Sequence, residues 1–150
     1  MDRQVPLRDV IAAIARATQK RFAPSFRRAT RGYPTEETMS EAPLATGAPA
    51  SKGVAVGPVR LVHSVDDFDA VRPGDVIVCR TTDPQWTVLF GMVAAVVTET
   101  GGILSHAAIV AREYGIPAVV AAKGAMEILA NHRTISVDGT NGHVHAVRSI

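Results

Sequence analysis

The chain has 150 residues, 47% of them hydrophobic and 20% charged, so it can build one ordinary globular domain but hardly two. Its longest apolar runs, 92–97 and 116–122, are far shorter than the roughly 20 residues of a membrane-spanning helix. The first residues lack the apolar run and cleavage site of a secretory signal. The single cysteine, Cys79, cannot form an internal disulfide, so we expect a reducing, cytoplasmic location.

The formal net charge of +2 is distributed unevenly along the chain. Residues 1–31 carry eight basic side chains against two acidic ones, whereas residues 51–150 carry eight basic against nine acidic. The basic character therefore belongs to the N-terminal arm, where it suits a solvated face or a segment that docks on an acidic partner or nucleic acid. The balanced charge of the remainder argues against nucleic acid as a partner of the domain itself.

The first expected element is an amphipathic helix in a basic arm of residues 1–22. After Pro6, apolar residues recur at helical spacing, which predicts a helix over about 7–22. Residues 23–52 contain four prolines and two glycines with little hydrophobic periodicity, which is typical of a linker. We therefore expect the folded domain to span residues 53–150.

From residue 53 onward, short apolar runs alternate with short amphipathic segments, and glycine or proline turns separate them. Asp83 is a possible N-cap of a short helix, and Gly115 closes a longer one. We expect strands over 54–62, 76–79, 93–97 and 117–120, helices over 85–90, 105–114 and 124–130, and a hairpin of 134–137 with 143–147. This order predicts an α/β domain.

The most informative segment is 98–120. An expected strand ends there, Gly101 and Gly102 form a turn, and His106 lies at the start of an apolar helix. Backbone N–H groups and the positive end of the helix dipole converge at such a turn. A neutral imidazole nitrogen placed there is a good nucleophile. The segment therefore predicts a histidine that carries an anion.

The run from Gly101 through His106 to Val120 resembles the signature of the phosphohistidine, or swivelling, domain of enzymes that make or use phosphoenolpyruvate. Such enzymes include pyruvate phosphate dikinase, phosphoenolpyruvate synthase, rifampicin phosphotransferase and enzyme I of the sugar phosphotransferase system. The similarity extends over about residues 47–147, with further matching stretches at 53–58, 73–76, 83–87 and 137–139. The resemblance implies a swivelling β/β/α phosphohistidine domain.

The resemblance also implies roles for particular residues. His106 is the residue that one catalytic domain phosphorylates and that passes the group on at another. Gly101 and Gly102 leave room for the phosphoryl group, and their N–H groups can donate to its oxygens. Ser105 caps the helix or reaches a phosphoryl oxygen. The alternatives are a simple tight turn at the glycines and a hydrogen-bonded structural histidine at His106.

Three neighbouring positions complete the comparison with the family. Thr98 is similar to the family's threonine that helps to orient the histidine. Arg112 is similar to its arginine, which meets phosphate in a docked state. Local capping or a surface salt bridge is the alternative for both. Ala121 stands where family members usually have glycine, which predicts a stiffer loop there.

The sequence contains no nucleotide-binding loop of the form Gly-x-x-x-x-Gly-Lys-Ser/Thr. The resemblance therefore implies that a separate ATP-grasp-like protein binds ATP and Mg²⁺, and that a second partner site accepts the phosphoryl group. His143 and His145 share one face of an expected strand, but no third ligand with suitable spacing accompanies them. We predict no metal site.

Together these patterns predict a stand-alone phosphohistidine carrier domain with His106 as its shuttle. Two alternatives stay open at this point. The chain could be a non-catalytic binding or regulatory module that docks through its basic arm. It could also be the C-terminal remnant of a split enzyme similar to phosphoenolpyruvate synthase or rifampicin phosphotransferase.

Overall fold

The computed structural model describes residues 42–147, so the expected N-terminal helix and most of the expected linker lie outside the described part. Within that part, eight strands alternate with α-helices and two 3-10 helices. The strands are β1 (Ala45–Thr46), β2 (Ala48–Ser51), β3 (Val54–Leu61), β4 (Val76–Cys79), β5 (Ala95–Thr98), β6 (Ala118–Val120), β7 (Thr134–Asp138) and β8 (His143–Ala146). The helices are η1 (Val65–Ala70), η2 (Pro84–Trp86), α2 (Thr87–Phe90), α3 (His106–Tyr114) and α4 (Ala125–Leu129).

Strand β3 joins two differently paired halves of the sheet, whose order is β1-β8-β7-β3-β4-β5-β6-β2. Residues 54–58 of β3 pair antiparallel with β7, whereas residues 59–61 pair in parallel with β4. Near this change of partner, a Cβ on Gly57 would lie 2.3 Å from the carbonyl oxygen of Gly74. Only glycine fits there without a shift of the backbone.

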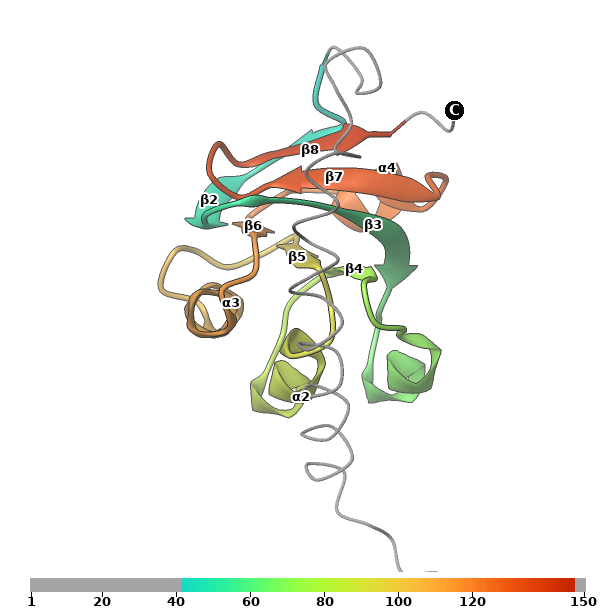
Figure 1. Cartoon of the computed structure of the whole chain (residues 1–150), viewed down its shortest axis with the longest axis vertical. Helices are drawn as coiled ribbons and strands as arrows, with labels where there is room; N and C mark the ends of the chain where they lie inside the picture. Colours follow the sequence, from blue (N-terminus) through green and yellow to red (C-terminus); the bar gives the residue numbers. More distant parts are fainter. Residues whose placement is uncertain (1–41, 148–150) are drawn as a thin grey trace, which may run out of the picture.

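The parallel strands β4, β5 and β6 form the middle of three layers (Figure 1). Their side chains alternate between two cores, as strand geometry requires. Ile77 and Val96 pack on one side with residues of α2 and α3. Val78 and Val97 pack on the other side with residues of β7, β8 and α4. Because both faces are covered, these strands are nearly continuous apolar runs, and the expected β/β/α arrangement of an α/β domain is confirmed.

The expected boundary between linker and domain at residue 53 is wrong. Residues 45–46 pair with β8 as β1, and residues 48–51 pair with β6 as β2. Prolines and glycines made this segment similar to a linker, but Pro49 lies in an edge strand beside a register shift, where proline is tolerated. A Cβ on Gly47 would lie 2.3 Å from the carbonyl oxygen of Val120, so that glycine allows a close backbone approach.

Most other expected elements are present in the structure. The N–H of Gln85 donates to Asp83 Oδ1 at 2.9 Å, which makes Asp83 the N-cap of η2. Gly115 ends α3 in the left-handed conformation, with φ 69°. The short acidic helix η1 was not expected, because its sequence has no helical apolar periodicity and it buries no residue. Among residues 42–147, no helix combines the length and apolar character needed to cross a membrane.

Candidate phosphohistidine site

His106 is the first residue of α3, and its side chain is half-buried. Ser105 precedes it in an extended conformation, and its hydroxyl accepts the N–H of Ala108 at 3.4 Å, so Ser105 is the helix N-cap. Gly101 opens the preceding loop with φ 96°, a conformation that favours glycine. The histidine therefore lies where a strand, a glycine turn and a helix N-terminus meet, as the sequence predicts.

Two threonine hydroxyls hold the imidazole ring. Thr82 Oγ1 lies 2.9 Å from His106 Nδ1, and Thr87 Oγ1 lies 3.1 Å from Nε2. The ring of Phe90 meets the imidazole edge-on, with 6.2 Å between centroids. Thr82 follows β4 and Thr87 begins α2, whereas the histidine follows β5. Since β4 and β5 are parallel neighbours, the segments after their carboxyl ends lie at the same edge of the sheet.

The loop from residue 101 to 105 is open to solvent on its outer side. Ile103 is 55% exposed and Leu104 is 80% exposed, although both are large apolar side chains. A Cβ on Gly102 would meet no atom within 4 Å. The space at Gly102 is therefore free, and the loop that leads to the histidine presents apolar side chains to solvent.

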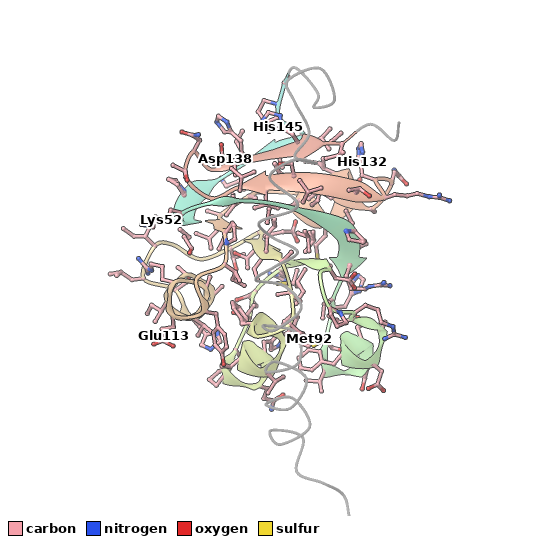
Figure 2. All side chains as sticks on the ribbon, in the orientation of Figure 1. Lys52, Met92, Glu113, His132, Asp138 and His145 are labelled. Atoms are coloured by element: carbon pink, nitrogen blue, oxygen red, sulfur yellow. The ribbon has the colours of Figure 1, made fainter. Side chains whose placement is uncertain are left out.

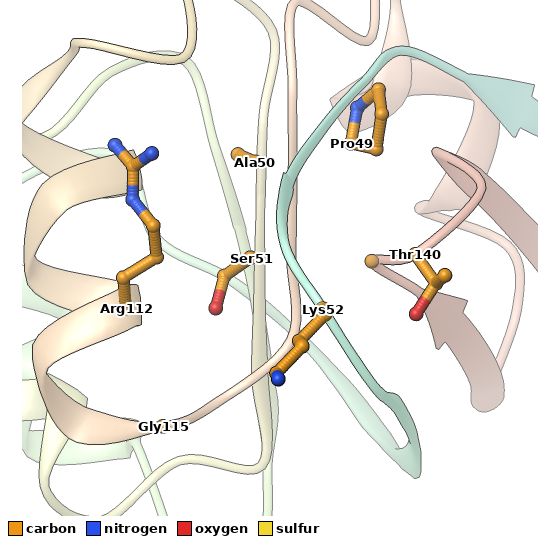
Figure 3. Close-up of a pocket in the computed structure, with 8 residues that line it drawn as sticks. Pro49, Ala50, Ser51, Lys52, Arg112, Gly115 and Thr140 are labelled. Carbon is orange, nitrogen blue, oxygen red and sulfur yellow. The ribbon is translucent and has the colours of Figure 1, made fainter.

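Arg112 connects this loop to α3 through hydrogen bonds. Its Nε donates to the carbonyl oxygen of Ala108 at 3.1 Å, and Nη2 donates to the carbonyl oxygen of Ile103. The same side chain lines a hollow of about 530 Å³, with Ser51, Lys52 and Thr140 on its other walls (Figure 3). Arg112 thus supports the shape of the histidine loop, and a direct contact with phosphate would need these bonds to rearrange.

The expected contact between Thr98 and His106 is absent from the described structure. Thr98 is only 1% exposed, and its hydroxyl donates to the carbonyl oxygen of Thr100 at 2.7 Å. This bond stabilises the turn between β5 and the glycine loop. The hydroxyls bound to the ring belong to Thr82 and Thr87, which the sequence had not singled out.

The sequence contains a partial signal for the role of Thr82 and Thr87. Thr82 directly precedes the 83–87 stretch that resembles the family, and Thr87 is the last residue of that stretch. The sequence separations of 24 and 19 residues from the histidine carry no periodic pattern, so their proximity follows only from the pairing of β4 with β5. The tertiary structure is therefore needed to identify the two hydroxyls that contact the ring.

Cys79 lies at the end of β4, directly paired with Thr98 of β5. Burial, with a smaller contribution from the charge of Glu99, raises the pKa of the Cys79 thiol to about 12. The thiol therefore stays protonated at neutral pH and is no competing nucleophile. Within residues 42–147, His, Cys, Asp and Glu side chains form no group of three that could hold a metal ion.

Residues 71–142 match the family model of the mobile domain of PEP-utilising enzymes. Phosphotransferases and a phosphoenolpyruvate synthase are also similar to this chain.

Among the relatives, an uncharacterized phosphotransferase of Bacillus subtilis is 50% identical over 67% of this chain and 12% of its own length. The rifampicin phosphotransferase of Bacillus subtilis is 42% identical over 65% of this chain and 11% of its own length. The phosphoenolpyruvate synthase of Aeropyrum pernix is 44% identical over 75% of this chain and 14% of its own length. The chain therefore spans only a small part of these relatives.

Among solved structures, the solution structure of an Enzyme I protein is 32% identical to this chain. The match covers 49% of this chain and 31% of that one, with a TM-score of 0.41.

Proposed function

We propose that this domain carries a phosphoryl group on His106 and relays it between two partner sites. The observation that carries this proposal is the placement of the imidazole. Both ring nitrogens are hydrogen-bonded to threonine hydroxyls at the N-terminus of α3, beside a loop with open space at Gly102. The match of residues 71–142 to the family model of the PEP-utilising mobile domain supports the same chemistry.

The chemical step is a displacement at phosphorus. The lone pair of one imidazole nitrogen forms the N–P bond while the P–O bond to the leaving group breaks, and the leaving group keeps that electron pair. Backbone N–H groups of the loop at Gly101 and Gly102 and the positive end of α3 favour the transferred negative charge. A second acceptor then attacks the phosphorus, and the N–P bonding pair returns to the ring.

The phosphoryl donor in this proposal is ATP with Mg²⁺, bound by an ATP-grasp-like partner domain or protein. The apolar Ile103 and Leu104 lie exposed next to His106, and exposed apolar groups of this kind mark contact surfaces. They would be covered when the histidine enters the partner's catalytic site. Cys79 is a free, buried cysteine, which suits a reducing compartment, and we place the transfer in the cytoplasm.

The chain covers between 11% and 14% of the length of the three relatives described above, so its role as a separate carrier is part of the proposal. The favoured role needs only the described domain and a partner that supplies the phosphoryl group. The same step would take place if the domain were one part of a longer enzyme.

A labelling experiment tests the assignment. The chain is incubated with ATP labelled at the γ-phosphate, Mg²⁺ and the nucleotide-binding part of a related phosphotransferase, and the bound label is measured after treatment with acid or base. We expect an acid-labile, base-stable adduct that His106→Gln abolishes. His63→Gln is the matched control, since His63 is exposed and contacts Asp67 instead of the site. Label that persists in His106→Gln would overturn the proposal.

A further inference from the structure

We propose that Thr82 is a positioning residue that keeps the proton of the neutral His106 ring on Nδ1, and so leaves the lone pair of Nε2 for the phosphoryl group. The inference rests on the proposed carrier function and adds a residue to it. It starts from one contact, the 2.9 Å approach of Thr82 Oγ1 to Nδ1.

A neutral imidazole has one N–H donor and one acceptor nitrogen, and a hydroxyl can serve either. The two threonines are therefore compatible with both tautomers, and sterics must decide which one reacts. Nδ1 is adjacent to the ring carbon that bears Cβ, so it lies close to the main chain of α3. Nε2 is the nitrogen farther from the main chain, and a tetrahedral phosphoryl group is accommodated there more easily. Nε2 can attack only when the ring proton is on Nδ1. The Nδ1–H group then needs a hydrogen-bond acceptor.

Thr82 supplies that acceptor, and the other polar groups near the ring have different partners. The Thr98 hydroxyl donates to Thr100, and the Ser105 hydroxyl accepts the N–H of Ala108. Phe90 contacts the ring but has no polar atom. Among the described residues, the hydrogen bond recorded for Nδ1 is the one with Thr82.

The segment that holds Thr82 is itself fixed to the other side of the site. The carbonyl oxygen of Arg80 accepts both the N–H and the hydroxyl of Thr100, each at 3.0 Å. The loop after β4 is thereby joined to the loop after β5, which leads to the histidine. An acceptor on a fixed segment can hold a ring in one orientation, as partners of catalytic histidines generally do.

The two threonines consequently have different parts in the transfer. As the Nε2–P bond forms and the P–O bond of the donor breaks, the Nδ1 proton stays on the ring, and Thr82 accepts its hydrogen bond before and after the step. Thr87 lies 3.1 Å from Nε2, the nitrogen that attacks the phosphorus. Its hydroxyl has to turn away from Nε2 when the phosphoryl group arrives, whereas the Thr82 contact persists.

Nitrogen-15 NMR of the imidazole tests the proposal on the unphosphorylated full chain, at a pH where His106 is neutral. We expect the Nδ1–H tautomer to predominate in the native chain. Thr82→Val removes the acceptor, and the population should shift toward Nε2–H, with Thr87 as the new acceptor. Thr82→Ser should restore the native pattern. Thr81→Val, at the exposed neighbouring threonine, is the matched control and should change nothing.

Kinetics provide the second readout. Thr82→Val should slow phosphorylation of the chain by about 10- to 100-fold, by analogy with the loss of a partner that orients a metal-bound histidine, and Thr82→Ser should recover most of the rate. If valine disturbs the fold, as backbone amide spectra would show, Thr82→Ala replaces it in both measurements.

A native chain with mainly Nε2–H, or a tautomer unchanged in Thr82→Val and Thr82→Ala, would overturn the assignment. The NMR measurement needs no phosphoryl donor, so its outcome is independent of whether His106 is ever phosphorylated. Failure of the proposed function would instead appear as a native chain that takes up no label.

Discussion

Two leucines show how differently the packed β7–β8 side of this domain and its histidine loop, residues 101–105, are built. Leu129 of α4 is fully buried between the sheet layers, among valines and alanines of β4, β5, β7 and β8. Leu104, two residues before His106, is 80% exposed. In Figure 2, Asp138 and His145 mark the β7–β8 side of the molecule, while Glu113 marks α3 on the other side. Close packing thus defines the first region, and the second leaves apolar surface available.

The glycines of the two regions differ in the same way. A Cβ on Gly139, after β7, would lie 1.8 Å from the carbonyl oxygen of Ser51, whereas one on Gly102 would meet nothing within 4 Å. The β7–β8 region therefore uses glycine to bring backbones together, and the histidine loop uses it to keep space open. The comparison predicts that stability depends on the β7–β8 region much more than on the histidine loop, and substitutions can test that separation.

The largest effect is expected at Gly139. Gly139→Ala places a methyl group against main-chain atoms of Ser51 and Ala118, which no side-chain rotation can relieve. We expect a loss of about 4 kcal/mol or more in the free energy of unfolding, enough to prevent folding of a marginal domain. Urea unfolding measures it. Gly102→Ala is the control and should stay within about 0.5 kcal/mol of the native chain. Equal losses in both variants would contradict the separation of the two regions.

The leucine pair should give the next largest difference. Leu129→Ala removes a fully buried side chain and leaves a cavity, which should cost about 3 kcal/mol. Leu104→Ala removes an exposed side chain and should change stability by less than about 0.5 kcal/mol. Denaturant midpoints at constant slope report both values. A Leu104→Ala chain as unstable as Leu129→Ala would show that the loop is part of the core.

A smaller effect of opposite sign is expected at Ala121, which has φ 56° although it is not a glycine. The left-handed conformation costs an alanine about 1 kcal/mol or more, and the greater freedom of glycine in the unfolded chain offsets part of the gain. Ala121→Gly should therefore raise the free energy of unfolding by about 0.5 kcal/mol. The adjacent Ala122→Gly, at a fully buried alanine outside the left-handed region, should lower the free energy of unfolding. Destabilisation by Ala121→Gly would show that the alanine methyl is needed there.

The smallest effect concerns pH and the β7–β8 turn. Burial by itself raises the pKa of Asp138, but hydrogen bonds from Asn141 and from the N–H of Thr140 outweigh it and lower the pKa below its usual value. The carboxylate then stabilises the fold above the unfolded-state pKa, and this contribution is lost as the pH falls through the folded-state pKa.

The urea midpoint should consequently begin to decrease below about pH 5 and decrease further as the pH falls through the lowered folded-state pKa, and Asp138→Asn should make the decrease smaller. The turn is partly exposed, so the difference between the two chains should be modest. Identical pH dependence in both would show that Asp138 makes no contribution.

Local patterns in the sequence predicted the α/β class and most elements. Apolar runs defined β4 to β6, and Asp83 and Gly115 marked helix ends, because these signals lie within a few residues of the element they specify. The strands β1 and β2 were missed, since their pairing partners lie about 70 to 100 residues away and an edge strand tolerates the prolines of a linker.

At the site, the placement of His106 and the capping by Ser105 followed from the local motif. The direction of the Thr98 side chain could not be predicted from this motif. Its hydroxyl donates to the carbonyl oxygen of Thr100, which the turn after β5 places nearby. Thr82 and Thr87 reach the ring only through the parallel pairing of β4 and β5. Backbone elements were therefore easier to predict than the hydroxyls that hold the functional ring.

The central claim is that His106 is the phosphoryl carrier, and locating the phosphoryl group on the loaded chain tests it most directly. After loading from ATP and Mg²⁺ by the nucleotide-binding partner, the chain is digested at alkaline pH and the fragments are sequenced by mass spectrometry. We predict one phosphoryl group per chain, on His106. A phosphoryl group on another residue, or a chain that stays unmodified while the partner itself turns over, would contradict the account.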